Sequence, residues 1–136
     1  MDIKTSIIHA IQNMDIDKLR PLLDKEVYYG VAKENFLEEF EWAFGIFKQE
    51  GDTQLLVHEG TCHCKSFWVD GSRGYSFVGN NSDTYLDIII EGDENNVTDI
   101  HYCDYFKTDD PAIDRFSRIA LFQSDEKYDC EHKHDD

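Results

Sequence analysis

The spacing of cysteine and histidine in this sequence suggests a metal site. Two pairs alternate along stretches that we predict to be β-strands, and a third pair lies near the end of the chain. Alternate residues of a strand face the same side of a sheet, so neighbouring strands could bring two such pairs together. Zinc binds thiolate and neutral imidazole in a tetrahedron. The six candidates are Cys62, Cys64, His101, Cys103, Cys130 and His132.

Within this set we expect Cys62, Cys64 and Cys103 to supply three of the four zinc ligands, and one of the other three candidates to supply the fourth. The alternative is that buried cysteines serve as small hydrophobic residues and that the histidines form ordinary hydrogen bonds. Because Cys-x-Cys is a weaker signature than paired Cys-x-x-Cys motifs, the sequence leaves both interpretations open.

Two other residues could act as a general base. His58 and Asp87 lie in predicted strands, and an imidazole or carboxylate in an apolar cavity can have its pKa tuned toward neutrality. However, Asp87 alternates with Leu86 and Ile88, which is also typical of a sheet with one solvated face. The chain has no glycine-rich phosphate loop, Ser-His-Asp signature or H-E-x-x-H motif.

The charge of the chain restricts its partners. With 13 basic and 29 acidic residues the formal net charge is −16, which repels nucleic acid phosphates and anionic lipid surfaces. The apolar runs fall far short of the ~20 residues that cross a bilayer. We therefore expect a soluble protein with no nucleic acid or membrane partner.

The N-terminal segment predicts a cytoplasmic location. Its apolar part is interrupted by His9, and no small-residue cleavage site follows, so it does not resemble a secretory signal. In a reducing compartment the four cysteines are free thiols or metal ligands. In an oxidising compartment the same number would suggest two disulfides.

The elements that must position these residues change type near residue 52. Before it, apolar residues recur every three or four positions, as in amphipathic helices; after it, short alternating runs are separated by turns. Such close strands must pair as antiparallel hairpins. We predict helices at 3–11, 16–23 and 33–50, strands at 27–29, 53–64, 67–69, 74–79, 84–91 and 97–106, and a C-terminal helix at 110–123.

This order predicts an α+β fold, with N-terminal helices packed on one face of an antiparallel sheet and an extra C-terminal helix. We expect residues 1–123 to form a single domain. Residues 124–136 are polar and form an acidic, histidine-containing tail.

The order of elements resembles the nuclear transport factor 2-like (SnoaL-like) superfamily over residues 3–107. The resemblance is carried by the N-terminal helix pair, Val27-Tyr28-Tyr29-Gly30, the helix at Phe36–Phe47 and the hairpins ending in Val97-Thr98-Asp99-Ile100. It implies a cystatin-like cone of helices against a strongly curved sheet, a pocket between the helices and the concave face, and a homodimer formed through the sheet. Some members of the superfamily are isomerases, dehydratases or cyclases, while many only bind or assemble.

From the resemblance and the lack of a convincing catalytic set, we predict a ligand-binding or assembly module with a structural zinc ion. Its ligand is expected to be small and apolar. The alternative is an enzyme of lyase or isomerase type with His58 or Asp87 as general base in the cone. This alternative requires a deep apolar pocket that contains one of these two groups.

Overall fold

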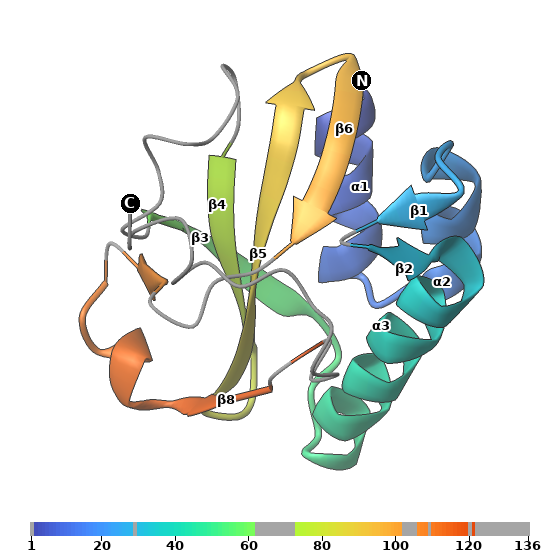
Figure 1. The fold of residues 1–136 in the computed structure, drawn as a ribbon. Coiled ribbons are helices and arrows are strands. Elements are labelled where there is room, and N and C mark those ends of the chain that lie inside the picture. Colours follow the sequence, from blue (N-terminus) through green and yellow to red (C-terminus); the bar gives the residue numbers. More distant parts are fainter. Residues whose placement is uncertain are drawn as a thin grey trace.

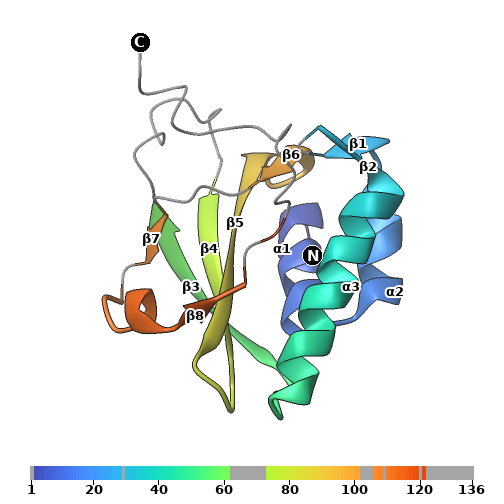
Figure 2. The same ribbon diagram turned by 60° about the horizontal axis from the view of Figure 1, so that its bottom comes forward.

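The predicted α+β class is confirmed. The computed structural model describes residues 2–28, 30–61, 73–101, 106–108, 110–119 and 121. Figure 1 and Figure 2 show the helices on one side of an antiparallel sheet. The elements are α1 (Ile3–Gln12), α2 (Ile16–Leu19), η1 (Arg20–Leu22), β1 (Val27–Tyr28), β2 (Val31–Ala32), α3 (Lys33–Gln49), β3 (Leu55–Thr61), β4 (Arg73–Gly79), β5 (Thr84–Asp93), β6 (Asn96–His101), β7 (Lys107–Thr108), η3 (Ile113–Arg115) and β8 (Ser117–Arg118).

The two N-terminal helices begin at aspartate caps. The Asp2 carboxylate accepts a hydrogen bond from the Thr5 backbone N–H at 2.8 Å, and Asp15 accepts one from the Lys18 N–H at 3.1 Å. Each bond satisfies a backbone donor that has no partner within its helix. α2 gives way to the short 3₁₀ turn η1 at Pro21, as the proline predicts.

The long helix α3 matches its prediction closely. It ends in a Schellman motif, in which the Asp52 N–H donates to the Phe47 carbonyl at 3.0 Å and the Gly51 N–H donates to the Lys48 carbonyl at 3.1 Å. Gly51 has φ +93°, which glycine adopts without strain. The helix buries six side chains against the sheet, namely Phe36, Leu37, Phe40, Ala43, Phe44 and Phe47.

The main sheet has the strand order β6-β5-β4-β3-β7, and each pair of neighbours is antiparallel. Its first four strands form a meander, as their short connections predict. β1 and β2 form a separate hairpin, and β1 lies beside β6 (Figure 1). The predicted strand at 67–69, residues 62–64 and the tail lie outside the described residues.

Alternation along the strands gives the sheet two different faces. Tyr75, Phe77, Leu86 and Ile88 join the large core under the helices. Val78 and Tyr85 point the other way and pack with Ile113 and Phe116. We call these the helix face and the outer face. Figure 2 shows β7 and β8 on the side of the sheet away from the helices.

The predicted C-terminal helix is wrong in extent. The structure has only the 3₁₀ turn η3, after which the chain extends into β8 and pairs parallel to β5. Among the described residues, β6 pairs with β5 only from Ile89 onward, and β8 pairs with Thr84 and Tyr85 at the start of β5. The Ser117 N–H donates to the Asp83 carbonyl at 2.9 Å, and the Ile119 N–H donates to the Tyr85 carbonyl at 2.8 Å. These bonds replace those that a helix would have formed.

The last predicted strand is also too long. β6 ends at His101, and Phe106 lies in no strand. Phe106 instead covers Gly60 and Gly74, where an added Cβ would lie 2.5 Å and 2.4 Å from its ring atoms. Because those two glycines belong to the outer face, Phe106 lies on the side of the sheet opposite to the core that contains Ile100.

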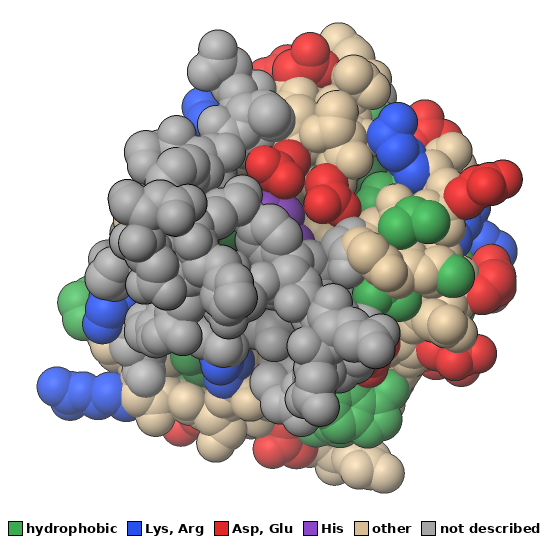
Figure 3. Space-filling model, in the orientation of Figure 1, with side chains coloured by type: hydrophobic (Ala, Val, Ile, Leu, Met, Phe, Trp, Pro, Cys, Tyr) green, Lys and Arg blue, Asp and Glu red, His purple; other side chains and the backbone are tan. Residues whose placement is uncertain are grey.

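None of the described helices is both long enough and apolar enough to span a membrane. In the view of Figure 3, acidic, basic and hydrophobic side chains are interspersed over the part of the surface formed by α2, α3 and the β1–β2 hairpin. The described surface in that view has no broad basic area of the kind that binds nucleic acid.

Candidate functional site

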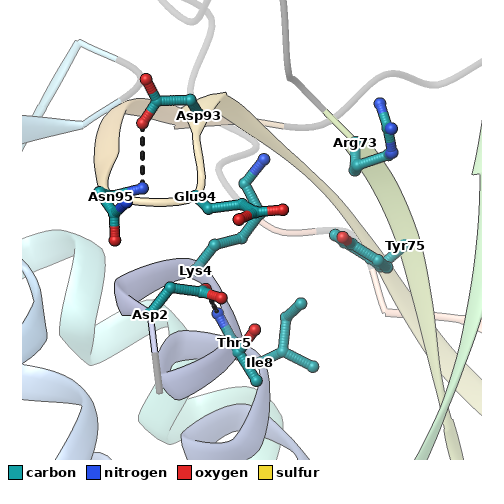
Figure 4. Close-up of a pocket in the computed structure, with 9 residues that line it drawn as sticks. All are labelled: Asp2, Lys4, Thr5, Ile8, Arg73, Tyr75, Asp93, Glu94 and Asn95. Carbon is teal, nitrogen blue, oxygen red and sulfur yellow. Dashed lines mark hydrogen bonds between the residues drawn. The ribbon is translucent and has the colours of Figure 1, made fainter.

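A cavity of about 370 Å³ opens on the helix face, between α1, β4 and the turn that joins β5 to β6. Figure 4 shows its walls. Lys4 and Ile8 come from α1, Arg73 and Tyr75 from β4, and Glu94 from the turn. Ligand pockets commonly have volumes of roughly 300–1,000 Å³, so the cavity is large enough for a small molecule.

Local structure explains how each wall presents its side chains. Lys4 and Ile8 are one turn apart on α1, so they share a side of the helix. Arg73 and Tyr75 alternate along β4 and therefore share the helix face of the sheet. These two walls face each other across the cavity (Figure 4).

The third wall depends on the tight turn between β5 and β6. Gly92 has φ +108°, and a Cβ at this position would lie 2.1 Å from the Asn96 carbonyl oxygen, so only glycine fits. The Asp93 carboxylate accepts a hydrogen bond from the Asn95 N–H at 2.9 Å. The turn is tied to the start of α1, because the Lys4 N–H donates to the Glu94 carbonyl at 3.2 Å.

Lys4 is unusual because it is a lysine with only 5% of its surface exposed. Its Nζ donates a hydrogen bond to the Gly92 carbonyl oxygen at 3.0 Å. Burial lowers the pKa of Lys4, because an ammonium loses its hydration there, and the nearby charge of Arg73 lowers it further. Acidic groups on the rim, led by Glu94, act in the opposite direction.

Tyr75 provides a hydroxyl group on the wall opposite Lys4 (Figure 4). Its side chain is largely buried, and its ring lies 6.4 Å from that of Phe77. Burial raises the pKa of the Tyr75 phenol, and the negative charge of Glu59 adds to this effect, while Arg73 opposes it. The phenol therefore keeps its proton at neutral pH and can donate it.

The residues predicted as general bases do not line this cavity. His58, Ser76 and Asp87 lie opposite one another on three adjacent strands, in one row across the outer face. The Ser76 hydroxyl donates to the Asp87 carboxylate at 2.5 Å, and both residues are buried. Serine occupies the middle of the row, whereas a catalytic triad needs histidine there. The lyase or isomerase alternative therefore gains no support from the helix-face cavity.

Of the six predicted zinc ligands, the structure describes only His101. It lies on the outer face, opposite Ile89, and is 1% exposed. Its Nε2 is 3.1 Å from the Glu91 carboxylate. The other five candidates, Cys62, Cys64, Cys103, Cys130 and His132, lie outside the described residues. Among the residues that are described, no three or more His, Cys, Asp or Glu side chains form a metal-binding group.

The sequence analysis did not identify Lys4, Arg73 or Tyr75. One signal was present, because Lys4 falls among the isoleucines that form the apolar side of α1. A lysine is rarely buried in that setting without a specific partner. Arg73 had no comparable signal, since the first residue of a strand after a turn is commonly charged and solvated.

No protein-family model matches this chain, and no curated protein or solved structure matches it either. A fold class alone does not determine function. The argument for a function therefore depends on the chemistry of the cavity residues.

Proposed function

We propose that this chain is a nuclear transport factor 2-like module that binds a small carboxylate ligand with an apolar body in the helix-face cavity. The observation that carries the proposal is the position of Arg73 at one side of a cavity of about 370 Å³, with the basic residue Lys4 on the opposite wall. The lining also carries three carboxylates, from Asp2, Asp93 and Glu94, so Arg73 is the group of this cavity that we expect to bind an anionic ligand.

The chemistry of the walls supports this class of ligand. An arginine guanidinium can hold a carboxylate through two parallel hydrogen bonds, and Arg73 stands at one side of the cavity. Ile8 and the ring of Tyr75 provide apolar surface for the rest of the ligand. Carboxylates at the rim, including Asp2 and Glu94, disfavour ligands with several negative charges.

The order of elements supports the family assignment that we propose. Two short helices, a small hairpin and a long helix precede an antiparallel meander, and the cavity lies between the first helix and the helix face. The segment containing β7, η3 and β8 departs from the superfamily pattern by covering part of the outer face.

The proposal is tested by titrating the protein with 3-phenylpropionate and following amide chemical shifts by NMR. Arg73→Gln should weaken binding about tenfold or more, because a charge-assisted hydrogen bond contributes roughly 1.5–3 kcal/mol. Arg115→Gln is the matched control, since Arg115 is exposed and lies in η3 on the other side of the sheet. Absence of binding, or equal effects of the two substitutions, would contradict the proposal.

A second candidate function is assembly through the sheet, which the edge strand β3 favours. β7 pairs only with Gly60 and Thr61, and no other described strand pairs with that side of β3. Leu56 and Val57 on this strand are 49% and 36% exposed. Open edges with exposed apolar side chains readily pair with another chain. We propose a homodimer through β3, which Leu56→Lys should dissociate in sedimentation experiments; a wild-type monomer at all concentrations would refute it.

The structural zinc ion stays a proposal based on the sequence. A metal-ligating histidine often donates its second ring N–H to a carboxylate, and the Glu91 carboxylate lies 3.1 Å from the His101 Nε2. Metal analysis of protein purified without an affinity tag, together with thiol counting, tests the proposal. Four freely reactive thiols and no zinc would refute it.

A further inference from the structure

We propose that Lys4 is a nucleophilic amine that forms an imine with small keto acids bound in the helix-face cavity. The inference rests on the proposed function, because a keto acid carries the carboxylate that the cavity is proposed to bind. It adds a covalent, reversible reaction to that binding, and it specifies the substrate class as 2-oxo acids with an apolar side chain.

The position of Lys4 supports this role. Its side chain extends from α1 toward the β5–β6 turn, between Glu94 and the wall that carries Arg73 (Figure 4). The hydrogen bond from Nζ to the Gly92 carbonyl, at 3.0 Å, holds the amine in place. In the pose that we propose, the ligand carboxylate contacts Arg73 on one wall, and the neighbouring carbonyl carbon faces the Lys4 Nζ from the other side of the same cavity.

The surroundings of Lys4 favour the reactive, neutral amine. Nucleophilic lysines are usually desolvated or lie beside another cation, and Lys4 meets both conditions. Burial and then Arg73 lower its pKa, against the opposing charges of Glu94, Asp93 and Asp2. A neutral amine can donate one N–H to the Gly92 carbonyl while its lone pair attacks a carbonyl carbon.

The reaction balances without an oxidant or a reductant. The Nζ lone pair forms the C–N bond, and the electron pair of the carbonyl bond moves to oxygen. That oxygen leaves as water with the two hydrogens of the amine, and the C=N bond remains. We assign the transfer of one proton to the leaving oxygen to Tyr75, which stands on the opposite wall and keeps its phenolic proton at neutral pH. The phenolate then takes back a proton from the nitrogen, so that both hydrogens of the water come in balance from the amine.

The test is to incubate the wild-type protein with phenylpyruvate and cyanoborohydride, which reduces an imine to a stable secondary amine. Modified lysines are then located by peptide mass spectrometry. Lys48 is exposed on α3 and serves as an internal control. Lys4 should be modified about tenfold or more faster than Lys48. Holding two reactants in the correct position can raise a reaction rate by much more than this, so the expected ratio is a modest one. Equal or slower modification of Lys4 would overturn the inference.

Two further measurements separate this inference from the proposed function. 3-Phenylpropionate lacks the 2-oxo group, so it should bind and protect Lys4 from modification by phenylpyruvate. If 3-phenylpropionate binds but Lys4 shows no preferential adduct, the imine is refuted and the carboxylate site stands. If neither compound changes the NMR spectrum, both proposals fail.

Discussion

Replacing Gly60 by alanine tests how closely the segment around Phe106 packs on the outer face. A Cβ at this position would lie 2.5 Å from the Lys107 carbonyl oxygen and 2.5 Å from a Phe106 ring carbon. Both distances are about 1 Å shorter than an ordinary contact between such atoms. Rotation of the ring cannot relieve the contact with the carbonyl oxygen, because Lys107 pairs with Thr61 in the sheet.

The expected magnitude follows from two opposing terms. Overpacking a well-packed site lowers the free energy of unfolding by roughly 1–3 kcal/mol. Replacing glycine by alanine raises it by roughly 0.4–1 kcal/mol, because alanine restricts the unfolded chain. Gly60→Ala should therefore lower the free energy of unfolding by about 1–2 kcal/mol. Gly45→Ala is the matched control, because a Cβ at Gly45 on exposed α3 has no neighbour within 4 Å. Helix propensity predicts that this control is more stable by about 0.5–1 kcal/mol.

Urea denaturation followed by circular dichroism measures both variants. With an m-value of about 2 kcal/mol/M, the midpoints of the Gly60 and Gly45 variants should differ by about 1 M. If Gly60→Ala is as stable as Gly45→Ala, the close approach of β7 and Phe106 to the sheet is wrong. In that case the outer face is covered more loosely than the register of β3 and β7 indicates.

Other predictions concern buried and exposed polar groups. Ser76→Ala should lower the free energy of unfolding by about 2 kcal/mol in urea titrations, because it removes a buried hydrogen bond to the Asp87 carboxylate; a loss below about 0.5 kcal/mol would contradict this. The pKa of Lys4 is lowered in the folded state, whereas the unfolded lysine keeps its proton up to about 10.5. The free energy of unfolding of the wild type should therefore rise relative to that of Lys4→Met as the pH increases from the lowered pKa toward 10.5. Urea titrations at several pH values measure this difference, and a difference that does not change with pH would refute the prediction. Arg20→Gln should leave the urea midpoint unchanged, because the ion pair of Arg20 with Glu34 joins side chains that are 45% and 68% exposed. A clearly lower midpoint would contradict this prediction and show that the ion pair stabilises the fold.

Prediction from the sequence succeeded where the signal is local. The apolar spacing of α3 acts within a few residues, and this helix appears where we predicted it. The aspartate before α2 and the glycine after α3 are local signals of the same kind. It failed at the C-terminal segment, where Ile113, Phe116 and Ile119 have helical spacing. There the exposed edge of β5 offers hydrogen bonds from a distant part of the chain, and these favour β8.

The cavity could not be predicted from the sequence. Lys4 and Arg73 are far apart along the chain, and they line one cavity only because α1 packs on β3 and β6 and is tied to the β5–β6 turn. The candidate bases His58 and Asp87 have unremarkable positions in the sequence. Their placement on the outer face depends on the parity of each strand relative to the helices.

The sequence by itself determined the acidic charge, the amphipathic helices and the alternation that makes a two-faced antiparallel sheet. These properties depend on each residue and its near neighbours, so they can be predicted without knowledge of the fold. Only the tertiary structure decided the order and register of the strands, the turn of the chain at β8 and the approach of Lys4 to Arg73. Those features depend on contacts between distant segments, whose free energy is set by packing and by the hydrogen bonds that each edge leaves available.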